Sequence, residues 1–155
     1  TKCDGIKLEG GRKITEIVKH LVKFKIPVIG HIGITPQSVR GKFRYKGKTD
    51  IEKKNLLKDS KSLEDAGVFA IVLECIERKL SKEITDSINI PTIGIGSSNF
   101  CDGQIMVTDD LLGLTDTKIK FVKKYADLKG SVKNAVKKFK LDVKKGSYPS
   151  IKYSY

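Results

Sequence analysis

Two periodicities of hydrophobic residues alternate along the chain. Short, continuously apolar runs predict strands. Between them, apolar residues recur every three or four positions, which is typical of a helix with one buried face. The predicted strands are residues 5–8, 27–33, 68–73, 91–96 and 104–107. One predicted helix follows the first strand, and a second spans about 50–66. A short one contains Leu80 and Ile84, and the last two cover about 118–127 and 131–145.

This order of elements predicts an α/β fold. Strands that are apolar throughout, each separated from the next by a helix, are typical of parallel βαβ units. The two candidate architectures are a doubly wound sheet and part of a (β/α)8 TIM barrel. A full barrel takes about 250 residues, whereas this chain of 155 residues holds about five units. We expect a single domain over residues 1–155.

Polar residues near the carboxyl ends of three predicted strands favour the barrel. Lys7 and Glu9 close the first strand, His31 lies in the second, and Glu74 ends the third. Barrel enzymes draw their catalytic groups from that end of several strands. A doubly wound fold instead carries a glycine-rich phosphate loop after its first strand. Here the Gly94-x-Gly96 pair follows the fourth strand and lacks a third glycine.

Glu74 is the first candidate for chemistry. The alternation of a strand places Ala70, Val72 and Glu74 on one face. A partly desolvated carboxylate at the rim of a buried strand is a suitable general base. The same pattern fits equally well a strand-end carboxylate that faces solvent or a lysine.

Lys7, Glu9 and His31 are weaker candidates on spacing alone. A lysine and a carboxylate two residues apart on a strand share a face. That pair suits an anionic substrate beside a divalent metal ion, although a surface ion pair of small energy is the simpler interpretation. His31 has Gly30 and Gly33 near it, which allow close approach of backbone or ligand. A lone histidine is more often structural.

Composition indicates a globular, cytoplasmic protein. Hydrophobic residues make up 39 % of the chain and charged residues 32 %. No apolar run approaches the roughly 20 residues that cross a bilayer, and the first residues show no secretory signal. The three cysteines form no C-x-x-C pair, so a disulfide framework or a zinc site is not expected, and so few and widely spaced cysteines fit a reducing compartment.

The net charge of +13 is concentrated near the carboxyl end. Residues 118–155 carry 12 lysines against Asp127 and Asp142, a net charge of +10. Nucleic-acid binding is one interpretation, and a contact surface for a partner subunit or an acidic cosubstrate is another. No nucleic-acid-binding motif accompanies the lysines, so solvated outer helix faces are the favoured interpretation. A basic nucleic-acid-binding module therefore stays an alternative function.

Five sequence blocks, in order, resemble the ketopantoate hydroxymethyltransferase family. The resemblance covers essentially all 155 residues. The second block is specific to the family even when it is taken by itself. The blocks are IKLEGG at 6–11, IPVIGHIGITPQSV at 26–39, AIVLECI at 70–76, IPTIGIG at 90–96 and CDGQI at 101–105.

The resemblance implies a fold and a reaction. The fold is a (β/α)8 barrel of the pyruvate/phosphoenolpyruvate type, assembled as a homo-oligomer, commonly a decamer. The reaction moves a hydroxymethyl group from 5,10-methylenetetrahydrofolate to 3-methyl-2-oxobutanoate. Its product is 2-dehydropantoate (ketopantoate), for pantothenate and coenzyme A biosynthesis. Mg²⁺ binds the keto acid, and the partners are small molecules, with no nucleic acid and no membrane.

By match to the family's blocks, four residues receive roles. Glu74 is the general base that removes the C3 proton, Lys7 contacts the keto-acid carboxylate, Glu9 lies in the metal shell, and His31 lines the pocket. A related metal-dependent 2-oxo acid lyase is the alternative enzyme. The cysteine nucleophile of such lyases has no counterpart in the predicted loop 35–49.

The sequence also departs from the family pattern. Three βα units precede the IKLEGG strand in the family, so we expect this chain to hold only the last five units of a barrel and to be inactive alone. Where the family has G-I-G-A-G, this chain has Ser97 and Ser98 after Gly96. Asp109 stands where the family has histidine. Neither smaller departure is expected to touch the predicted base.

Overall fold

The computed structural model describes residues 2–37 and 44–155. Contacts within the chain group it into two compact units, residues 1–105 and 106–155. Each unit is described by itself. The single domain over residues 1–155 therefore stays a prediction.

A five-stranded parallel sheet forms the first unit. The strands stand in sequence order, each paired with the next. They are β1 (Ile6–Glu9), β2 (Val28–Gly33), β3 (Ala70–Glu74), β4 (Thr92–Ile95) and β5 (Gly103–Gln104). A doubly wound sheet reverses its strand order at a switch point, and this sheet does not. The predicted α/β fold is confirmed, with the topology of a partial (β/α)8 barrel.

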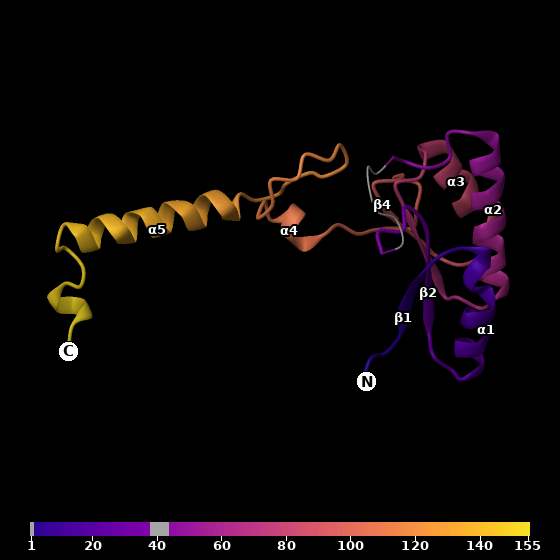
Figure 1. The fold of residues 1–155 in the computed structure, drawn as a ribbon, viewed down its shortest axis with the longest axis horizontal. Helices are drawn as coiled ribbons and strands as arrows, with labels where there is room; N and C mark the ends of the chain where they lie inside the picture. Colours follow the sequence, from indigo (N-terminus) through magenta and orange to yellow (C-terminus); the bar gives the residue numbers. More distant parts are fainter. Residues whose placement is uncertain (1, 38–43) are drawn as a thin grey trace. The chain divides into compact units, whose positions relative to one another are not determined.

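The helices of this unit lie on one side of the sheet (Figure 1). They are a short 3-10 turn, η1 (Arg12–Ile14), followed by α1 (Thr15–Lys23), α2 (Asp50–Asp65) and α3 (Arg78–Ser87). The start of α2 is set by Thr49, whose side chain accepts a hydrogen bond from the Glu52 N–H at 3.2 Å. Its end is set by Gly67 at φ +94°, close to the end predicted near residue 66.

The core lies between this helical layer and one face of the sheet. Every second residue of the central strands points into it, and the matching helix positions close it from the other side. Its fully enclosed members include Val18, Val28, Leu63, Ile71, Leu73 and Ile84. The remaining strand positions, including His31 and Glu74, face the other side of the sheet.

The last connection of the sheet is a loop, and its final strand is shorter than predicted. β5 has two residues where a strand over 104–107 was predicted. The Ile105 N–H still donates to the Gly94 carbonyl at 3.0 Å. After that bond the chain leaves the sheet and enters the second unit.

The second unit contains α4 (Thr108–Leu111), α5 (Leu128–Lys144) and η2 (Ile151–Tyr153). The predicted helix over 131–145 is confirmed as α5, but the predicted helix over 118–127 is wrong. That segment turns back on α4, and the Tyr125 N–H donates to the Leu111 carbonyl at 2.8 Å. This bond satisfies a carbonyl that the end of α4 leaves open. In the described residues, no helix is both long and apolar enough to cross a membrane.

Replacing Leu63 by alanine is expected to lower the free energy of unfolding by about 2–5 kcal/mol, because a fully enclosed leucine leaves a cavity. Ile51 on the same helix is 73 % exposed, so Ile51→Ala should change stability by less than about 0.5 kcal/mol. Urea unfolding followed by circular dichroism measures both. Equal losses would show that the buried face of α2 is assigned wrongly.

Candidate active site

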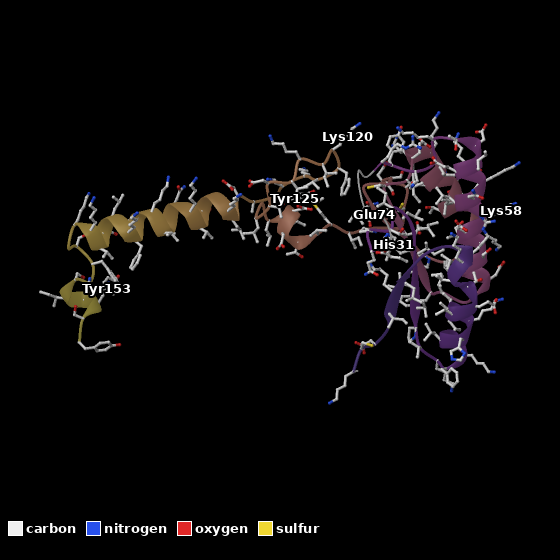
Figure 2. The ribbon with its side chains drawn as sticks, in the orientation of Figure 1. His31, Lys58, Glu74, Lys120, Tyr125 and Tyr153 are labelled. Atoms are coloured by element: carbon white, nitrogen blue, oxygen red, sulfur yellow. The ribbon has the colours of Figure 1, made fainter. Side chains whose placement is uncertain are left out.

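Three strands end side by side at one edge of the sheet. The parallel register pairs Glu9 with His31 and Gly33 with Glu74. Because side chains alternate along each strand, Glu9, His31 and Glu74 share the face that the helices do not cover. Figure 2 shows the His31 and Glu74 side chains next to each other at this place.

His31 lies between the two carboxylates. Its Nε2 is 3.1 Å from Glu74 Oε2, and its Nδ1 is 3.7 Å from Glu9 Oε1. The histidine is 1 % exposed, and the side chains of Glu9 and Glu74 are 6 % and 16 % exposed. The three groups therefore form one largely buried ionisable cluster.

Neither contact is aligned as a hydrogen bond. Both ring nitrogens are buried and, within residues 2–37 and 44–155, have no hydrogen-bond partner. The 3.1 Å distance from Nε2 to Glu74 is short enough for a hydrogen bond, but its direction is not suitable. A ring N–H donates only along the plane of the ring. An unsatisfied buried polar group costs about 1–3 kcal/mol. Such a group in a native protein calls for an explanation, and a catalytic role is one of the known ones.

Glu9 also binds the segment that follows β2. Its Oε2 accepts a hydrogen bond from the Gln37 N–H at 3.0 Å. Lys7, two residues earlier on the same strand face, is exposed. The hydrogen bonds and ion pairs among the described residues do not bring Lys7 into contact with Glu9, His31 or Glu74.

The backbone turns sharply directly after Glu74. Cys75 adopts φ +51°, in the left-handed region that residues with a Cβ rarely occupy. Its N–H donates to the Ile95 carbonyl at 2.9 Å, and the Glu74 carbonyl accepts from the Ile34 N–H at 2.9 Å. A Cβ on Gly33 would lie 2.1 Å from that carbonyl, so the close approach of β2 requires glycine here. The predicted role of the glycines near His31 is confirmed for Gly33.

A second segment crosses this turn. The Lys46 N–H donates to the Cys75 carbonyl at 2.8 Å, and the Glu77 N–H donates to the Lys46 carbonyl at 2.9 Å. Glu52 anchors the segment, since its carboxylate accepts from the Lys48 N–H at 2.9 Å and the Gly47 N–H at 3.0 Å. The bond from Lys48, followed by that from Gly47, holds the pKa of Glu52 below its ordinary value.

Ser97, just beyond β4, bonds both sides of the turn that carries Glu74. Its hydroxyl donates to the Leu73 carbonyl at 2.6 Å and accepts from the Ile76 N–H at 3.1 Å. Among the described residues, no hydrogen bond joins Ser97 to Glu74 itself, but Ser97 bonds the backbone on both sides of it. The sequence marks position 97 as a departure and carries no local signal for where its hydroxyl lies.

The cluster does not by itself make a metal cage. Among the described residues, no group of three or more histidine, cysteine, aspartate or glutamate side chains is arranged to hold a metal ion. Glu9 offers one buried carboxylate, and the imidazole of His31 lies between it and Glu74. The roles predicted for Lys7, Glu9, His31 and Glu74 stay predictions. The structure brings three of the four together.

Comparison with known proteins gives one consistent match. A sequence model described as "Ketopantoate hydroxymethyltransferase" matches residues 1–151. Three relatives share the name 3-methyl-2-oxobutanoate hydroxymethyltransferase. That of Pelagibacter ubique (strain HTCC1062) is 56 % identical over 155 residues, which is 100 % of this chain and 60 % of the relative.

The other two relatives are more distant. That of Clostridium botulinum (strain Loch Maree / Type A3) is 50 % identical over 153 residues, covering 97 % of this chain and 56 % of the relative. That of Pyrobaculum neutrophilum is 48 % identical over 150 residues, covering 96 % and 58 %. The chain thus spans 56–60 % of the length of these relatives.

The Cys75 thiol is expected to react slowly with iodoacetamide in the folded chain. Burial, and then the charge of Glu74, raise its pKa to about 11. At pH 8 this leaves about 100-fold less thiolate than an ordinary thiol has. The more basic thiolate is also more nucleophilic, which raises its reaction rate about tenfold and offsets part of this loss. Peptide mass spectrometry should find Cys75 alkylated about tenfold more slowly in the folded chain than in urea, with the rate rising toward pH 11. Equal rates in both states would refute the buried setting.

Proposed function

We propose that this chain, which belongs to the ketopantoate hydroxymethyltransferase family, supplies the proton-abstracting part of a hydroxymethyl transfer. The acceptor is 3-methyl-2-oxobutanoate and the donor is 5,10-methylenetetrahydrofolate. With one water, they give 2-dehydropantoate and tetrahydrofolate, a step of pantothenate biosynthesis. The observation that carries the proposal is the buried contact between His31 and Glu74, with Glu9 on the other side of the imidazole.

Glu74 is the base in this proposal. A proton on the carbon next to a ketone is removed by a nearby carboxylate. The C–H bond breaks, an O–H bond forms on Glu74, and the electron pair moves to the keto oxygen as an enolate. The 16 % exposure of the Glu74 side chain supports this role, because the carboxylate is shielded from water yet reachable. The resulting carbon nucleophile then takes up the one-carbon unit.

His31 orients the base. Its Nε2 faces Glu74 Oε2 at 3.1 Å and its Nδ1 faces Glu9, so the imidazole restricts where the Glu74 carboxylate can lie. Lys7 is proposed to bind the carboxylate of the keto acid. Its exposed ammonium group stands on the same sheet face, two residues before Glu9, and a lysine binds an anion as a flexible point charge.

Magnesium finds an incomplete set of ligands in the described residues. Mg²⁺ takes oxygen ligands in near-octahedral geometry, and Glu9 is the carboxylate that we propose for its shell. We propose that its other ligands come from the part of the full-length relatives that this chain does not represent. Bound there, the ion would stabilise negative charge on the keto oxygen.

The second unit supports the proposal of a homo-oligomer, which the family resemblance implies. One side of α5 leaves large apolar side chains exposed, between 48 % and 61 %. They are Val132, Val136, Phe139 and Val143. A contiguous exposed apolar surface of this kind marks an interaction site. We place the assembled enzyme in the cytoplasm, where its small-molecule substrates would be its partners.

The reaction is tested by deuterium exchange at C3 of 3-methyl-2-oxobutanoate in D2O, followed by NMR with Mg²⁺ and without folate. One sample is the 155-residue chain, for which we expect no exchange above buffer. The other is a chimera in which this chain replaces the aligned segment of the Pelagibacter ubique relative. In the chimera, exchange should depend on Mg²⁺ and fall at least about 100-fold in Glu74→Gln.

Glu16→Gln in the same chimera is the matched control, because the Glu16 side chain is 84 % exposed. Its exchange rate should stay within about twofold of the parent. A folded chimera without exchange would overturn the proposed function. Full exchange in Glu74→Gln would remove Glu74 from the role of base.

A further inference from the structure

We infer that Ser97 is a positioning residue for Glu74. The inference rests on the proposed function, in which Glu74 acts as the base. Ser97 lies 23 positions further along the chain, directly after β4, and does not touch the Glu74 carboxylate. It acts through the backbone that carries that carboxylate.

A single hydroxyl closes the backbone around the base. Ser97 Oγ donates to the Leu73 carbonyl at 2.6 Å and accepts from the Ile76 N–H at 3.1 Å. Leu73 precedes Glu74, and Ile76 follows Cys75. The two residues between these bonds are therefore the base and the left-handed Cys75.

The turn needs such a closure because its conformation is unfavourable. Cys75 carries a Cβ at φ +51°, and a backbone in that region persists only when the surrounding contacts determine it. Contacts come from three sides. Ile34 binds the Glu74 carbonyl, Ile95 binds the Cys75 N–H, and Lys46 binds the Cys75 carbonyl. Ser97 adds bonds to the peptide groups on both sides of the base.

Ser97 is half-buried, and water has little access to the two backbone groups that its hydroxyl bonds. Ile76 is 2 % exposed and Leu73 is fully buried. Loss of the hydroxyl would leave the Ile76 N–H without its partner in a buried turn. The Glu74–Cys75 backbone would then gain freedom, and with it the carboxylate that stands 3.1 Å from His31 Nε2. A displacement of about 1 Å in a reacting group can lower a rate by up to about 100-fold.

Ser98 is a natural control beside it. Its hydroxyl accepts from the Phe100 N–H at 3.1 Å, within its own loop, and it is 5 % exposed. The two serines thus differ in what they hold and not in chemistry. Ser97→Ala removes the closure, Ser98→Ala removes a neighbouring and more deeply buried hydroxyl, and Ser97→Thr keeps the hydroxyl at position 97.

The first measurement uses the 155-residue chain and needs no activity. Amide hydrogen exchange and NMR relaxation are recorded for Glu74, Cys75 and Ile76. In Ser97→Ala we expect the Ile76 amide to exchange at least about tenfold faster. The backbone order parameters of Glu74 and Cys75 should fall from about 0.85 to below about 0.6. Ser98→Ala and Ser97→Thr should keep the parent values.

The second measurement is the deuterium exchange reaction in the chimera. Ser97→Ala should lower kcat about tenfold and leave KM within about twofold, because the substrate contacts are intact and the base is misplaced. Unchanged amide exchange and order parameters would overturn the inference whatever the activity. A loosened turn with unchanged kcat would make Ser97 structural only. If the turn is loosened in Ser97→Ala but the parent chimera shows no deuterium exchange at C3, the proposed function is refuted. The role of Ser97 in holding the turn is then still supported.

Discussion

The common direction of β1, β2 and β3 is the constraint on which the candidate site depends. Parallel strands bring all their carboxyl ends to one edge, so Glu9, His31 and Glu74, far apart in the sequence, meet there. Side-chain alternation then sends the three to the sheet face opposite the helices. The layer of helices that includes α2 and α3 stabilises the strands, because it buries the strand positions that alternate with those of the site. Core and site thus come from the same strands, one residue out of phase.

The end of β3 shows how the backbone supports that arrangement. A strand that ends in a sharp left-handed turn must find partners for its peptide groups outside the regular ladder. Here they come from the chain after β2, from the end of β4, from Ser97 and from the segment around Lys46. The position of Glu74 is therefore determined by three further stretches of sequence, after β2, around Lys46 and from the end of β4 to Ser97. This explains why a position that looks like an ordinary loop serine bears on the base.

Patterns read from the sequence are reliable where local and tertiary preferences agree. The four strands before residue 96 and the helices between them follow from apolar periodicity, because each buried face is long enough to show it. Residues 118–127 have helical spacing, yet backbone bonds to the end of α4 hold them in another conformation. Strand alternation alone predicted that Glu74 stands at the rim. The contact between Glu74 and His31 depends on the register of their strands, which has no local sequence signal. The hydrogen bonds of Ser97 depend on the conformation of the loop after β4, which has none either.

The position of the imidazole between two carboxylates separates their proposed tasks. A carboxylate bound directly to a metal ion is a poor proton acceptor, because its lone pairs are engaged and the ion's charge stabilises its ionised form. Glu74 and Glu9 stand on opposite sides of His31, so an ion held at Glu9 would be kept from Glu74 by the ring. A base and a metal ligand can then share one buried cluster. The ring also keeps the two carboxylates from lying directly against each other.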